Sequence, residues 1–152
     1  FGDETFNLPR EVVLGEDFYM NLCLGIRAKK VGLFNDIIVY EYHENQNSVT
    51  HNYSFSSVSP FKSQQAAIKA ILEENHLFSE YQTLYYAMAV NSLVSACLHN
   101  KKLLSEKYTR EIGAAAFDAP LPKRERMYCL LLKYPLLYPL FLTLNYLRKK
   151  LA

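Results

Sequence analysis

Several common catalytic and binding motifs are absent from this sequence of 152 residues. Its five glycines are scattered, so no Gly-rich loop is available to cradle a phosphate group. The sequence has no G-x-S-x-G, and no cysteine at a recognisable spacing from a histidine, so the usual nucleophile motifs are missing. It also lacks an Asp-x-Asp, an H-x-x-x-H and an H-x-x-E-H. We therefore expect this chain alone to bind no metal.

Cysteine is also scarce, with Cys23, Cys97 and Cys129 as the three examples. Each lies in an apolar, helix-like context. An odd number without a C-x-x-C spacing argues against a disulfide framework and against a zinc site. We predict three buried, reduced thiols, as in a cytosolic protein.

The charge is nearly balanced, with a formal net charge of +2, which is too small to indicate a nucleic-acid partner. Tryptophan is absent, but tyrosine occurs 12 times. Tyrosine has an apolar body and a polar tip, which suits half-buried helix faces, carbohydrate contacts and membrane interfaces alike. Half of the residues are hydrophobic and 21% are charged, which indicates a folded chain and argues against disorder.

An acidic pair, Glu16 and Asp17, opens a predicted helix over residues 15–29. Three apolar side chains follow at helical spacing: Phe18, Leu22 and Ile26. We expect the pair in the first turn, exposed, with the apolar stripe beginning at Phe18. The helix dipole favours negative charge there, so a purely structural role for both acids is one explanation.

Residues 31–43 are rich in β-formers, and the pair Asn35-Asp36 interrupts them. This pattern predicts either a short hairpin or two consecutive strands. A polar, Ser/Asn-rich loop follows over residues 44–58 and contains Ser48-Val49-Thr50.

The order of acidic pair, helix, strands and Ser-Val-Thr resembles the C-terminal part of bacterial family 2 glycosyltransferases of the GT-A fold. The resemblance covers residues 5–52. It implies that residues 1–58 end a GT-A catalytic domain and that residues 59–152 form an α-helical C-terminal domain. The chain starts at Phe1, with no initiator methionine and no signal-peptide pattern, and the nucleotide-binding half of such an enzyme is missing. We therefore expect a fragment.

The resemblance implies transfer of a sugar from a nucleotide-sugar to a hydroxyl of a saccharide or lipid-linked acceptor, with inversion, in surface polysaccharide or lipopolysaccharide synthesis. Asp17 would be the general base, with Glu16 beside it as an acid that either supports Asp17 or contacts the acceptor. Mn²⁺ or Mg²⁺ and the nucleotide would be held by the missing half, so the fragment alone would be inactive. The implied location is the cytoplasm, at the inner face of the cytoplasmic membrane.

The resemblance also marks His43, Ser48 and Thr50 as substrate-binding candidates. The family often has an arginine at the position of His43. A histidine there suits a contact to diphosphate or metal, or simply a solvated loop.

After residue 58 the sequence predicts four or five helices, so the expected fold is mainly α with a short β-strand pair. The predicted starts are Ser59 with Pro60, a capping box at residues 79–82, Ser105 and Pro122. A helical interaction or homodimerisation module without chemistry of its own is the alternative function.

Residues 127–147 are strongly apolar but contain two prolines and a lysine, so they lack the ~20 uninterrupted apolar residues of a spanning helix. Residues 134–152 end in Arg148-Lys149-Lys150. This pattern fits a segment lying on a membrane surface, and equally a core helix packed on residues 79–98.

Overall fold

The computed structural model describes residues 9–12, 14–30, 32 and 55–143. In chain order the elements are α1 (Glu16–Arg27), α3 (Ser59–Glu74), α4 (Phe78–His99), the 3₁₀ helix η2 (Lys101–Ser105), α5 (Lys107–Phe117), α6 (Lys123–Lys133) and the 3₁₀ helix η3 (Pro135–Leu137). Residues 138–143 are helical as well.

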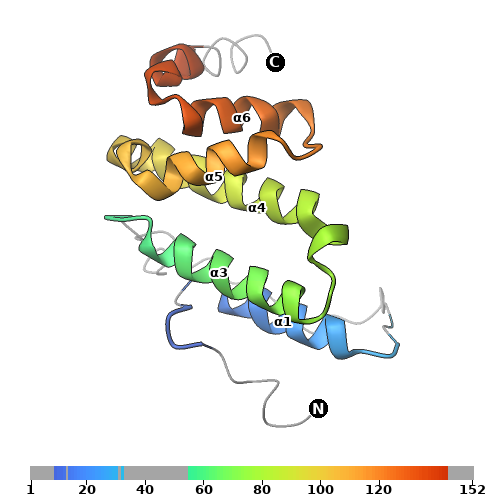
Figure 1. Ribbon diagram of the computed structural model, residues 1–152. Helices are drawn as coiled ribbons and strands as arrows, with labels where there is room; N and C mark the ends of the chain where they lie inside the picture. The colour runs from blue at the N-terminus through green and yellow to red at the C-terminus, as the bar shows by residue number, and fades with distance from the viewer. Residues whose placement is uncertain (1–8, 13, 31, 33–54, 144–152) are drawn as a thin grey trace.

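The helices are stacked in layers, as Figure 1 shows. α1 lies beside α3, and α3 packs on α4. On its other side α4 contacts α5 and α6, which form a helical hairpin. α4 is therefore the central element, and α1 and the C-terminal segment lie at opposite ends of the stack.

The predicted fold class, mainly α with a short β-strand pair, is wrong in its strand pair, because the part that the structure describes is helical and contains no strand. The predicted strands over residues 31–43 lie outside the described residues, except for Gly32. The proposed domain boundary near residue 58 stays a prediction. Apolar residues on its N-terminal side, Leu14 and Phe55, pack against the main core cluster.

Two clusters of buried side chains hold the stack together. The main cluster lies around α4, α5 and α6 and includes Leu93, Cys97 and Leu132, none more than 1% exposed. A smaller cluster lies between α1, α3 and α4, with Ile68, Leu72 and Tyr85 at its centre. No helix among the described residues is long and apolar enough to cross a membrane.

The predicted helices after residue 58 are confirmed, but the predicted serine caps are wrong. α3 begins at Ser59 with Pro60 in its first turn, yet its N-cap residue is Val58. α4 begins at Phe78 rather than within the capping box, and no side chain caps its N-terminus. Ser105 belongs to η2, where its hydroxyl donates a hydrogen bond to the Lys102 carbonyl at 2.7 Å.

The turn between α3 and α4 explains why α4 needs no side-chain cap. His76 adopts a φ of 57°, and the Leu77 N–H donates to the Leu72 carbonyl at 2.8 Å, which is the Schellman arrangement. The Leu77 carbonyl then accepts from the backbone N–H groups of Glu80 and Tyr81. One tight turn thus ends α3 and starts α4.

The prediction of buried, free thiols is confirmed for Cys23, Cys97 and Cys129. Burial raises the pKa of the Cys97 thiol to about 12 and that of Cys129 to about 11. Both thiols therefore stay protonated at neutral pH and behave as small apolar side chains.

Candidate functional site

Gly15 sets the position of the acidic pair. Its φ is 65°, in the left-handed region that glycine adopts without steric cost. A Cβ atom at this position would also overlap the carboxamide of Gln64, a buried residue of α3. Gly15 therefore turns the chain into α1 and lets the start of α1 approach α3 closely.

Glu16 and Asp17 occupy the first turn of α1, and both side chains are exposed, as predicted. The backbone N–H of Phe18 donates a hydrogen bond to Asp17 Oδ1 at 2.7 Å. Within the described part of the chain neither carboxylate forms an ion pair. Two adjacent carboxylates are thus presented to solvent at a helix N-terminus, a position that suits acidic side chains.

The apolar stripe of α1 differs from the predicted one at its first position. Phe18 is 44% exposed, so the stripe does not begin there. Tyr19, Leu22 and Ile26 pack on the smaller cluster instead, and Cys23 is the one residue of α1 that is buried. Burial raises the pKa of Tyr19, whose hydroxyl lies beside the Cys23 thiol. Residues other than the acidic pair therefore hold α1 in place.

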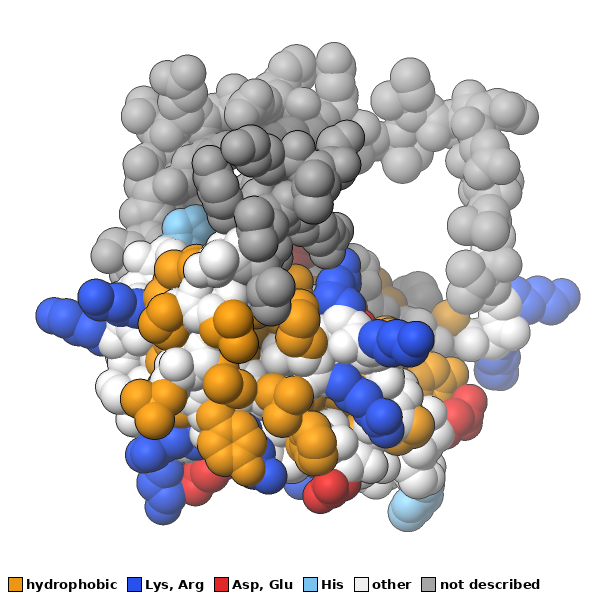
Figure 2. All heavy atoms as spheres, turned by 90° about the horizontal axis from the view of Figure 1, so that it is seen from above, with side chains coloured by type: hydrophobic (Ala, Val, Ile, Leu, Met, Phe, Trp, Pro, Cys, Tyr) orange, Lys and Arg blue, Asp and Glu red, His pale blue; other side chains and the backbone are white. Residues whose placement is uncertain are grey.

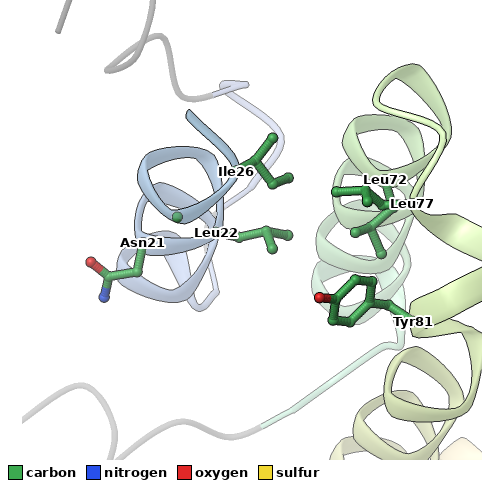
Figure 3. A pocket seen from close by; sticks show the side chains of 7 residues that line it. Asn21, Leu22, Ile26, Leu72, Leu77 and Tyr81 are labelled. Atoms are coloured by element: carbon green, nitrogen blue, oxygen red, sulfur yellow. The ribbon is translucent and has the colours of Figure 1, made fainter. Parts of the chain in front are cut away.

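A cavity of about 380 Å³ lies between α1 and the α3–α4 turn. Figure 3 shows Leu22 and Ile26 pointing from α1 toward Leu72 and Leu77, while Asn21 points away from them. Tyr81, at the start of α4, brings a hydroxyl to the lining.

A second hollow of about 50 Å³ shares Leu22 and Tyr81 with this cavity and reaches Phe18 and Leu84. The two together form a largely apolar groove along α1. Because Phe18 directly follows Asp17 in the chain, one end of the groove lies next to the acidic turn.

The other predicted site residues, His43, Ser48 and Thr50, lie outside the described residues. Among the residues that are described, no group of three or more His, Cys, Asp or Glu side chains could hold a metal ion. These residues therefore supply no ligand set for the divalent metal that the resemblance implies.

Two polar networks that the sequence did not reveal lie inside the helical stack. Tyr108 on α5 donates a hydrogen bond to Gln65 Oε1 on α3 at 2.6 Å, and Gln65 Nε2 is buried with no hydrogen-bond partner among the described residues. On α6, Glu125 accepts hydrogen bonds from Arg124 at 2.7 and 2.9 Å and from Asn91 on α4 at 3.3 Å. The first network joins α5 to α3, and the second joins α4 to α6, so both have a structural role. Long-range pairs of this kind carry no local sequence signal.

Comparison of the chain with protein-family models, with curated proteins and with solved structures finds no match in any of the three.

Proposed function

We propose that the chain is the C-terminal part of an inverting glycosyltransferase, in which Asp17 takes the proton of the acceptor hydroxyl. The observation that supports this proposal most is the position of Asp17, whose carboxylate is exposed in the first turn of α1. The fold does not need it there, because Gly15 makes the turn and Tyr19, Leu22 and Ile26 make the packing contacts.

In the proposed reaction the acceptor oxygen attacks the anomeric carbon of the nucleotide-sugar. The nucleoside diphosphate leaves with the bonding electrons, and Asp17 receives the hydroxyl proton. A base must be within reach of the proton that it accepts, and an exposed carboxylate in a first helical turn is accessible to an acceptor. Glu16 would contact the acceptor from the adjacent position.

Other parts of the enzyme would complete the site. Residues of the nucleotide-binding half would hold the nucleotide and the divalent metal, which neutralises charge on the leaving diphosphate. His43, Ser48 and Thr50 are proposed donor contacts. The groove that begins at Phe18 offers apolar surface together with the Tyr81 hydroxyl, which suits a saccharide or lipid-linked acceptor. The proposed setting is polysaccharide or lipopolysaccharide assembly at the cytoplasmic face of the membrane.

The test is the Asp17→Asn substitution in a protein that also contains the nucleotide-binding half. Asparagine keeps the size of the side chain but cannot accept the proton, so transfer should fall by ~10²–10⁴-fold. Glu80→Gln is a matched control, because Glu80 is also an exposed acid in the first turn of a helix, α4. Glu16→Gln should reduce transfer less than Asp17→Asn.

Transfer by Asp17→Asn within a few-fold of the Glu80→Gln control would contradict the base assignment. If the unsubstituted protein transferred no sugar from any nucleotide-sugar, the alternative function would be favoured, namely a helical interaction or dimerisation module.

A further inference from the structure

Large apolar side chains lie exposed at the end of the stack that follows α6. Leu136 is 94% exposed and Leu140 is 58% exposed. Together with three exposed neighbours they form what we call the leucine patch: Tyr134, Leu136, Leu137, Leu140 and Leu142. Figure 2, which looks down on this end, shows hydrophobic side chains gathered there with Lys and Arg side chains beside them.

The exposure of the leucine patch follows from how its segment is anchored. Phe141 is 4% exposed, and its ring meets the ring of Tyr128 on α6 edge-on at a centroid distance of 5.6 Å. Because Phe141 faces α6, its neighbours Leu140 and Leu142 lie on other sides of the same helical turn and face outward. The fold thus holds these side chains in solvent rather than in the core.

Basic side chains on α6 border the leucine patch. Lys133 Nζ lies 5.2 Å from the ring centre of Phe117 and 5.4 Å from that of Tyr134. Further along α6, three more cations are exposed: Lys123, Arg124 and Arg126. The only acid within α6, Glu125, is buried and hydrogen-bonded to Arg124. The solvent-accessible charged side chains of α6 are therefore all basic, and one of them, Lys133, contacts Tyr134 of the leucine patch.

We propose that the leucine patch and the basic surface of α6 dock on an anionic lipid bilayer. The leucines would enter the acyl boundary, Tyr134 would lie at headgroup depth, and Lys133 and Arg126 would contact anionic headgroups. A second copy of the chain fits this surface less well, because a symmetric pairing would bring like charges together. The proposal does not depend on the sugar-transfer function.

The experiment is flotation of the full chain with phosphatidylcholine vesicles, with and without phosphatidylglycerol. The variant is Leu136→Ser with Leu140→Ser, and the matched control is Leu98→Ser, a leucine of α4 that is 43% exposed and lies outside both the leucine patch and the groove. The double variant should bind the anionic vesicles more than ~10-fold more weakly, and the control should bind like the unsubstituted chain. Arg126→Gln should weaken binding about five-fold. Thermal melting confirms that each variant is folded.

Three results would overturn the proposal. The first is flotation of the double variant equal to that of the unsubstituted chain. The second is the absence of flotation of the unsubstituted chain on anionic vesicles, or equal flotation on phosphatidylcholine alone. The third is a dimer in sedimentation analysis that the double variant abolishes without any change in flotation, which would assign the leucine patch to a second copy of the chain.

Discussion

α1 and α6 have almost the same length, 12 and 11 residues, but they are held in different ways. α1 buries only Cys23, and its other packing residues are half-buried against the smaller cluster beside an open groove. α6 buries four side chains, of which Cys129, Leu131 and Leu132 belong to the main cluster. The helix that carries the acidic pair is therefore lightly packed, whereas α6 at the other end of the stack is tightly packed.

Two helical glycines show this difference at single positions. A Cβ at Gly113 on α5 would lie 2.8 Å from Leu132 Cβ and 2.8 Å from the Lys133 nitrogen, both on α6. A Cβ at Gly25 on α1 would meet no atom of the described residues within 4 Å. The same substitution thus tests close packing at one site and open space at the other.

The largest effect is expected for Gly113→Ala. The added methyl group meets backbone atoms of α6 that cannot rotate away, so α5 and α6 must separate. Overpacking of this kind costs ~1–3 kcal/mol of unfolding free energy, which exceeds the gain in helix propensity. Urea denaturation measures the change. Stability equal to that of the unsubstituted chain would show that the α5–α6 contact is looser than described.

Gly15→Ala should destabilise the chain by ~1–2 kcal/mol, because alanine at positive φ is strained. The Gln64 carboxamide is flexible and can move, so backbone strain is the main cost. Urea denaturation would again report the loss. In an enzyme that contains the nucleotide-binding half, transfer should fall too, since the acidic pair would shift. A neutral effect on both measurements would remove Gly15 as the residue that positions α1.

Gly25→Ala should change stability in the opposite direction, by ~0.5–1 kcal/mol in favour of the folded state. Alanine is the better helix former, and the space around this position is open. Destabilisation in the same urea assay would mean that another part of the chain covers α1 there.

The smallest effect concerns Glu125, which links α6 to Asn91 on α4. Hydrogen bonds from Arg124 lower the pKa of this carboxyl below the ordinary glutamate range. A lowered folded-state pKa contributes stability that is present above the unfolded pKa and is lost as the pH falls through the folded value. Glu125→Gln should therefore flatten the acid limb of a plot of unfolding free energy against pH. Superimposable acid limbs for the two proteins would contradict this contribution.

The sequence predicted those features that depend on local pattern. Pro60 marked the start of α3, and Pro122 preceded α6. The exposed first-turn position of Glu16 and Asp17 was predicted in the same way.

Features that depend on tertiary packing were missed. The capping box at residues 79–82 failed because the turn at His76 starts α4 earlier, at Phe78, and the Leu77 carbonyl accepts from the backbone N–H of Glu80. The role of Gly15 depends on its approach to Gln64, which is 49 positions away (64 − 15) and leaves no local signal. The exposure of Phe18 likewise depends on the angle at which α1 meets α3 and α4.

The central claim is that α1 is packed more lightly than α4 and α6. Its most direct test is the rate at which the three buried cysteines react with a thiol reagent under native conditions. Cys23 reports on α1, Cys97 on α4 and Cys129 on α6, and mass spectrometry distinguishes their peptides. Reaction requires opening, and sparsely packed elements open at lower free energy than the whole domain. We predict that Cys23 is labelled well before Cys97 and Cys129, which should react together at the rate of global unfolding. Labelling of all three at one common rate would contradict a lightly packed α1.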